Sequence, residues 1–136
     1  MHPLNLILLV DDDLDDQGLF LDALQEIDAD ARLIAAINGI DAIDKLKRME
    51  KLPDLIFLDL NMPLMNGMQF LQELKRSAIW KDIPVIMYST SSYKKDIDTA
   101  LKAGAMDYIV KPFSFGELCE SLRDAVNRNF ASAHNP

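Results

Sequence analysis

The fold is decided by residues 55–63, which read Leu-Ile-Phe-Leu-Asp-Leu-Asn-Met-Pro. Four consecutive apolar residues end at one carboxylate, Asp59, and a turn marked by Asn61 and Pro63 follows. An apolar run without alternation is typical of a strand buried on both faces, as in a parallel sheet with helices on each side. We therefore expect Asp59 at the carboxyl end of a central strand, where open α/β sheets place their functional groups.

The rest of the chain repeats this arrangement of a short apolar run followed by a helical stretch. We predict strands at 6–10, 32–36, 55–58, 84–88 and 106–110. Between them, apolar residues recur at helical spacing, which predicts five helices, the first over 14–27 and the last ending near 128. Strands that alternate with helices predict an α/β fold, (βα) five times, with a parallel sheet.

Two polar patterns predict where helices begin. Asn66 followed by Gln69 has the spacing of a capping box. Farther along, we expect either Ser91 or Ser92 to cap the fourth helix, because serine side chains accept hydrogen bonds from the first free backbone N–H groups. Asn38 and Gly39 predict a turn before the second helix.

Composition excludes several classes of protein. The chain has 136 residues, enough for one domain, and its net charge of −8 disfavours direct binding to nucleic acid. The single cysteine, Cys119, lies on the apolar side of the last helix, so we expect a buried thiol. The chain contains no apolar run of the roughly 18 residues that a membrane span requires and no basic segment typical of a signal peptide. These features predict a cytoplasmic protein that does not bind membranes.

Polar residues capable of chemistry follow four of the five predicted strands. Because the carboxyl ends of these strands meet at one edge of the sheet, we expect a cleft that contains Asp11, Asp12, Asp59, Ser89, Thr90 and Lys111. Three close carboxylates repel each other by on the order of 4 kcal/mol per pair, and a hard cation relieves this repulsion. Mg²⁺ prefers carboxylates, waters and a phosphate oxygen, so the cleft suits phosphoryl transfer.

The acids that follow the first pair have a simpler interpretation. Asp13, Asp15 and Asp16 fit a solvated helix N-terminus, where the helix dipole favours negative charge. We assign them no chemical role.

Taken together, these motifs resemble the receiver domain of a two-component response regulator, of the stand-alone, chemotaxis-regulator-like kind. The resemblance covers about residues 4–129 and rests on Leu-Val-Asp-Asp at 9–12, Leu-Asp-Leu-Asn-Met-Pro at 58–63, Ser89, and Lys-Pro-Phe at 111–113. It implies a flavodoxin-like doubly wound fold with a five-stranded parallel sheet in the order 2-1-3-4-5. The first and fifth helices would cover one face and the other three the opposite face. We expect the domain at residues 1–130, followed by a short polar tail at 131–136.

The resemblance also implies a metal site. Asp59 would be the phosphoacceptor. Asp12 and Asp59 would bind Mg²⁺ directly, together with the main-chain carbonyl of Asn61. Asp11 would act through a water molecule.

Further residues are implied to sense the phosphoryl group. Ser89 and Lys111 would contact it, and Tyr108 would rotate between outward and inward positions. The peptide bond before Pro112 would be cis. Ser89 is preferred to Thr90 as the hydroxyl because its spacing from Asp59 and Lys111 fits the family.

As a receiver, the chain would take its phosphoryl group from a sensor histidine kinase or a histidine phosphotransfer protein. It would signal to an unknown downstream protein through the face formed by the fourth helix, the fifth strand and the fifth helix. The interpretation also allows a homodimer that forms when the protein is phosphorylated. Such a switch is not an enzyme, although it assists its own phosphorylation and slow autodephosphorylation.

Three alternatives stand against this interpretation. An aspartyl-phosphate phosphatase of the haloacid-dehalogenase type also uses Mg²⁺, but it needs a second aspartate two residues after the nucleophile, where this chain has Asn61. A receiver fragment of a larger DNA-binding regulator would differ only in its full reading frame. A nucleotide-binding module is disfavoured because the five glycines form neither GxGxxG nor a P-loop.

Overall fold

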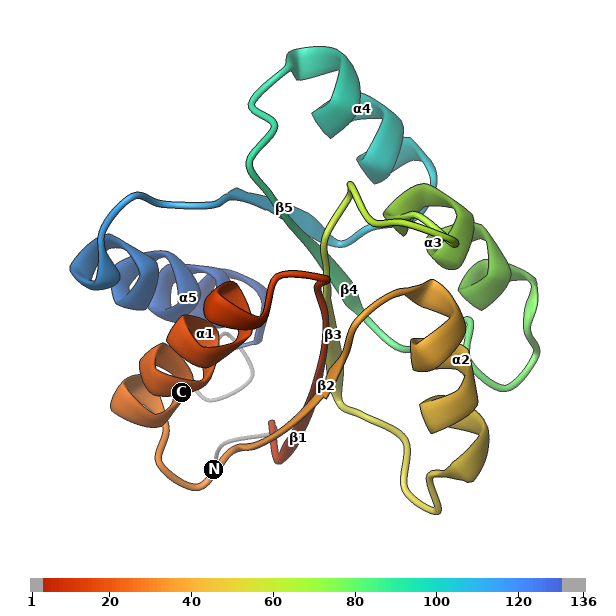
Figure 1. Ribbon diagram of the computed structural model, residues 1–136, viewed down its shortest axis with the longest axis horizontal. Helices are drawn as coiled ribbons and strands as arrows, with labels where there is room; N and C mark the ends of the chain where they lie inside the picture. The colour runs from red at the N-terminus through yellow and green to blue at the C-terminus, as the bar shows by residue number, and fades with distance from the viewer. Residues whose placement is uncertain (1–3, 131–136) are drawn as a thin grey trace.

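A five-stranded parallel sheet forms the centre of the molecule (Figure 1). The computed structural model describes residues 4–130, and the predicted tail at 131–136 lies outside them. The strand order is β2-β1-β3-β4-β5, as the resemblance implied. The strands are β1 (Leu6–Val10), β2 (Arg32–Ala36), β3 (Leu55–Leu58), β4 (Val85–Ser89) and β5 (Asp107–Val110). The helices are α1 (Leu14–Ile27), α2 (Gly39–Arg48), α3 (Gly67–Arg76), α4 (Lys94–Lys102) and α5 (Phe115–Phe130).

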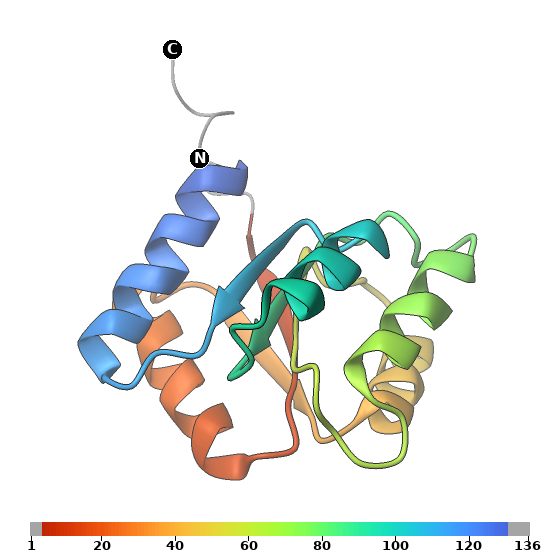
Figure 2. The same ribbon diagram turned by 90° about the horizontal axis from the view of Figure 1, so that it is seen from above.

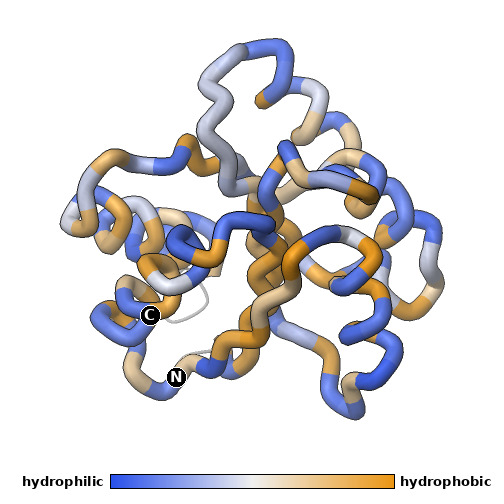
Figure 3. The backbone as a smooth tube through the Cα atoms, viewed as in Figure 1, coloured by the Kyte–Doolittle hydropathy of each residue, from blue (hydrophilic) through white to orange (hydrophobic). Residues whose placement is uncertain are grey.

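The helices cover both faces of the sheet. Helices α1 and α5 lie on one face, and α2, α3 and α4 lie on the other, which confirms the predicted layers (Figures 1 and 2). The tube in Figure 3 shows apolar residues concentrated along the central strands, between the more polar helices. None of the helices within residues 4–130 is long and apolar enough to cross a bilayer.

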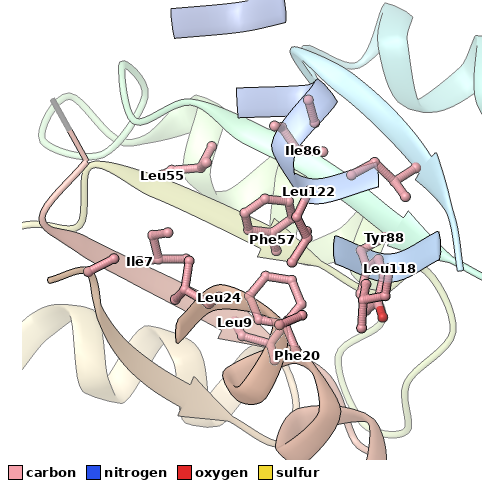
Figure 4. Close-up of a cluster of buried hydrophobic side chains, with 14 of the residues drawn as sticks. Ile7, Leu9, Phe20, Leu24, Leu55, Phe57, Ile86, Tyr88, Leu118 and Leu122 are labelled. Atoms are coloured by element: carbon pink, nitrogen blue, oxygen red, sulfur yellow. The ribbon is translucent and has the colours of Figure 1, made fainter. Parts of the chain in front are cut away.

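Strand β3 contributes to a core on each side of the sheet. Phe57 packs among the residues from α1 and α5, whereas Ile56 and Leu58 pack on the opposite face. The Phe20 ring meets the rings of Phe57 and Tyr88 edge-on, at centroid distances of 4.8 and 5.5 Å (Figure 4). Full burial of each such side chain contributes about 1.5–3 kcal/mol. The continuous apolar run therefore has the double-sided burial that its sequence predicted.

The predicted capping box at the start of α3 is confirmed. The Asn66 side chain accepts a hydrogen bond from the Gln69 N–H, and the Gln69 side chain accepts one from the Asn66 N–H, both at 2.9 Å. Asn38 is the N-cap of α2, so the predicted turn is the start of the helix itself. The buried free thiol of Cys119 is also confirmed.

Two local expectations were wrong. The N-cap of α4 is Tyr93, which makes no side-chain cap bond. Ser91 lies two residues before it, and its hydroxyl donates to the Asp96 carboxylate and accepts the Tyr93 N–H at 3.4 Å. All peptide bonds within residues 4–130 are trans, including that between Lys111 and Pro112. The trans form before proline is intrinsically favoured by about 0.5–1 kcal/mol, and in this conformation the Lys111 side chain already reaches the end of β3.

Candidate functional site

The sheet places four of the predicted site residues at its carboxyl edge. Asp11 directly follows β1, Asp59 follows β3, Lys111 follows β5, and Ser89 is the last residue of β4. Backbone bonds continue the sheet into this edge: the Asp59 N–H donates to the Val10 carbonyl at 2.9 Å, and the Lys111 N–H to the Ser89 carbonyl at 2.7 Å. Backbone hydrogen bonds to a neighbouring strand therefore hold each of these residues in place.

Three carboxylates converge at this edge, as predicted. Asp11, Asp12 and Asp59 each offer one carboxylate oxygen, and these oxygens lie within 4.8 Å of one another. Asp11 and Asp59 are buried, whereas Asp12 is exposed, so the cluster is open to solvent on one side. Burial raises the pKa of Asp59 to about 6, and Asp11 adds to the rise while the Lys111 ammonium opposes it. Burial raises the pKa of Asp11 as well, although Lys111 and the Asp13 N–H counteract it.

Lys111 forms ion pairs with three carboxylates. Its Nζ lies 2.8 Å from Asp11, 2.9 Å from Asp16 and 3.4 Å from Asp59. Burial alone would lower the pKa of the Lys111 ammonium, but the hydrogen bonds with Asp11 and Asp16 outweigh it and raise the pKa. The ammonium also lies over the Tyr88 ring, 5.1 Å from its centroid, a distance at which cation and ring attract. Lys111 therefore stays positively charged at the centre of the acids.

Asp16 is a member of this cluster that the sequence analysis missed. The Asp13 side chain caps α1 by accepting the N–H groups of Asp15 and Asp16, and the first turn directs Asp16 toward Lys111. A signal was available: Asp16 lies four residues before Phe20, which is fully buried, so both side chains fall on the inward face of the helix. Asp15, one residue earlier, is exposed.

The loop after β4 connects Ser89 to Tyr108. Ser89 is fully buried, and its hydroxyl oxygen accepts the Ser91 N–H at 3.2 Å. The Tyr108 hydroxyl, on β5, donates to the Ser91 carbonyl at 2.8 Å. Thr90 is exposed. A single loop residue, Ser91, therefore contacts both residues that were predicted to form the switch.

The loop after β3 is packed tightly under α3. The Asn61 N–H donates to the Asp59 carboxylate at 3.4 Å, and the Gly67 N–H donates to the Leu60 carbonyl at 3.0 Å. A Cβ at Gly67 would lie only 2.2 Å from the Asp59 carbonyl oxygen. Only glycine allows the helix start to approach the backbone of Asp59 this closely.

These features define a doubly wound α/β domain with a cluster of acids and a lysine whose side chain is largely buried, at the carboxyl edge of the sheet. The family model of the response regulator receiver domain matches residues 7–123. The chain therefore belongs to the response regulator receiver domain family, a class of signalling domains of two-component systems. Membership of this family does not favour the alternative interpretation as a phosphatase of the haloacid-dehalogenase type.

Individual relatives agree with this assignment. A chemotaxis protein CheY homolog from Campylobacter jejuni is 36% identical over 120 residues, which cover 88% of this chain and 91% of the relative. Chemotaxis protein CheY1 of Helicobacter pylori is 34% identical over 123 residues, covering 90% and 98%. The crystal structure of the phosphorylated cyanobacterial phytochrome response regulator RcpA superposes with a TM-score of 0.85 at 28% identity, covering 97% and 96%.

Proposed function

We propose that Asp59 accepts a phosphoryl group from a sensor histidine kinase or a histidine phosphotransfer protein, with Mg²⁺ as cofactor. The observation that carries this proposal is the cluster at the carboxyl edge. Asp59 has carboxylate oxygens of Asp11 and Asp12 within 4.8 Å and the Lys111 ammonium at 3.4 Å. A nucleophilic carboxylate, a cation site and a fixed positive charge are the groups that phosphoryl transfer to a carboxylate needs.

The donor set fits Mg²⁺. Three carboxylate oxygens lie within reach of one ion, and the exposed side at Asp12 leaves room for water ligands. Asp12 and Asp59 would hold the ion directly with the main-chain carbonyl of Asn61, and Asp11 would hold it through water. When bound, the ion supplies positive charge that neutralises the phosphoryl oxygens.

The transfer itself is a displacement at phosphorus. A carboxylate oxygen of Asp59 attacks the phosphorus and forms an O–P bond, while the P–N bond to the donor imidazole breaks and the nitrogen keeps the electron pair. A pKa of about 6 leaves Asp59 ionised at neutral pH, so the attacking oxygen carries charge. Lys111 donates a hydrogen bond to the transferred group. In slow autodephosphorylation, water attacks the phosphorus and the same O–P bond breaks, which releases phosphate.

The signal would pass through the loop after β4. The Ser89 hydroxyl donates to a phosphoryl oxygen and moves toward Asp59. Because Ser91 is bonded to both Ser89 and the Tyr108 hydroxyl, this movement would shift Ser91 and release Tyr108 to turn inward. A bond present only in the phosphorylated state biases a two-state element by differential binding.

The output would be the face formed by α4, β5 and α5. Leu101 on α4 and Val110 on β5 have exposed apolar side chains, which suit contact with a downstream protein. The same face would serve a phosphorylation-dependent homodimer. We also propose a cytoplasmic location, where the protein would meet the histidine kinase or phosphotransfer protein proposed as its partner.

Acetyl phosphate tests the proposal without a kinase. With Mg²⁺, intact mass spectrometry should show the gain of one phosphoryl group, and chelation of the metal should prevent it. Asp59→Asn should abolish the gain, because the amide is not a nucleophile. An undiminished gain in Asp59→Asn would assign the acceptor to another residue.

A further inference from the structure

The Lys111 ammonium donates hydrogen bonds to three carboxylates, and its bond to Asp59 is the longest. A lysine has three N–H donors, and all three are used: Asp11 at 2.8 Å, Asp16 at 2.9 Å and Asp59 at 3.4 Å. The first two distances are those of strong charge-assisted bonds, whereas the third is beyond that range. The Lys111 side chain is only 9% exposed, so water offers it few replacement partners.

From this geometry we infer that Asp16 is a positioning residue that competes with Asp59 for Lys111 and so slows phosphoryl uptake. The inference rests on the proposed role of Asp59 as acceptor. A phosphoryl group on Asp59 would need a short bond from Lys111, so one of the two short bonds must lengthen as the group arrives.

Of the two short bonds, the one between Lys111 and Asp16 is the one that lengthens. The Asp11 carboxylate is fully buried, so it would lose an ionic partner that bulk water cannot replace. The Asp16 side chain is 32% exposed, and water can solvate it when Lys111 leaves. The free energy of breaking this bond is therefore part of the barrier to uptake.

The position of Asp16 is set by the fold. Its N–H is held by the Asp13 cap at 3.1 Å. The next residue, Gln17, donates from its amide to the carbonyls of Asp11 at 2.7 Å and Ala36 at 3.3 Å. The first turn of α1 is thus tied to the ends of β1 and β2, and Asp16 holds Lys111 from a rigid support.

Asp15 provides a matched control on the same turn. It carries the same charge and the same cap bond to Asp13, but its side chain is exposed and makes no ion pair with Lys111. Replacing either acid by asparagine changes the net charge equally. Only Asp16→Asn removes a competitor for the ammonium.

The test compares wild type, Asp16→Asn, Asp15→Asn and Asp16→Glu. Phosphoryl uptake from acetyl phosphate with Mg²⁺ is followed by intact mass spectrometry, and the affinity for beryllofluoride with Mg²⁺ is measured by NMR titration. Relative to Asp15→Asn, Asp16→Asn should take up phosphoryl about three- to tenfold faster and bind beryllofluoride tighter by a similar factor, as expected for loss of one partly exposed ion pair. Asp16→Glu should return both values toward wild type. A purely structural role for Asp16 would not tighten binding when the carboxylate is removed.

The outcomes separate this inference from the function on which it rests. If wild type takes up phosphoryl but Asp16→Asn is no faster than Asp15→Asn, Asp16 does not compete for Lys111. A slower Asp16→Asn with weaker beryllofluoride binding would also overturn the inference, because Asp16 would then hold Lys111 in its working position. Failure of wild type to be phosphorylated would overturn the proposed function itself. Asp16→Ser provides a second comparison in case Asp16→Asn folds poorly.

Discussion

Removing the Asp59 charge should stabilise the metal-free protein. In the folded state the Asp59 carboxylate is buried beside Asp11, and its pKa rises from the ordinary 3.8 to about 6. The unfolded chain solvates the same carboxylate freely, so ionised Asp59 favours unfolding. Asp59→Asn keeps the size of the side chain and removes the charge. Asp12→Asn should act in the same direction, because it also reduces repulsion in the cluster.

The magnitude follows from the pKa change. A tenfold change in proton affinity corresponds to about 1.4 kcal/mol, so a move from 3.8 to about 6 costs the folded state on the order of 3 kcal/mol at pH 8. The shift to about 6 already includes the attraction of the Lys111 ammonium, 3.4 Å away, which lowers the pKa of Asp59. We expect a net gain of about 1–3 kcal/mol in the free energy of unfolding, and an increase in Tm of roughly 4–10 °C for a domain of this size.

The gain should depend on pH in a defined direction. Between pH 4 and pH 6 the folded state binds a proton at Asp59 that the unfolded state does not, so the stability contributed by this group falls as pH rises. At pH 8 the unfavourable contribution is complete. Below pH 4 both states are protonated and it vanishes. The advantage of Asp59→Asn over wild type should therefore be largest at pH 8 and shrink toward pH 4.

Thermal unfolding in chelator, monitored by circular dichroism at several pH values, measures this difference. Asp22→Asn is the control, because Asp22 is exposed on α1 and its replacement makes the same change in net charge. If Asp59→Asn melts below wild type at pH 8, or if its advantage grows as pH falls, the carboxylates do not repel as described.

Three further outcomes are expected. Mg²⁺ at ten times its Kd should raise the free energy of unfolding by about 1.4 kcal/mol, and Asp12→Asn should weaken this effect in the same melting experiment. Gly67→Ala should destabilise the protein by about 2–3 kcal/mol in urea unfolding, because the added Cβ meets the Asp59 carbonyl oxygen at 2.2 Å; a smaller effect than 1 kcal/mol would mean that the loop relaxes freely. Ser89→Ala should still accept phosphate but should show reduced NMR shifts at Tyr108 and α4 with beryllofluoride, and wild-type shifts would exclude Ser89 as the coupling residue.

The fold and most of the acidic cluster could be predicted from the sequence. Residues 55–58 form a continuous apolar run, and only a sheet covered on both faces buries such a run. Parallel strands bring their carboxyl ends to one edge, which predicts that Asp11, Asp59 and Lys111 lie close together. The ion pairs of Lys111 with Asp11 and Asp59 confirm this prediction.

What the sequence did not reveal depends on the direction of side chains and on the residue at which a helix begins. Asp16 was grouped with its neighbours as a solvated helix start, although its spacing from Phe20 placed it on the inward face. Residues 91–93 each offer a possible start for α4. The N-cap is Tyr93, and the Ser91 hydroxyl donates to the Asp96 carboxylate and accepts the Tyr93 N–H at 3.4 Å. Propensity alone does not rank such alternatives.

The most direct test of the account identifies the phosphorylated residue chemically. Borohydride reduces an acyl phosphate to an alcohol, so protein treated with acetyl phosphate and Mg²⁺, then reduced and digested, should contain homoserine at position 59. The peptides that contain Asp11 and Asp12 should be unmodified. Homoserine at position 11 or 12, or a phosphoryl group that survives reduction on a serine, would contradict the assignment of Asp59 as the phosphoacceptor.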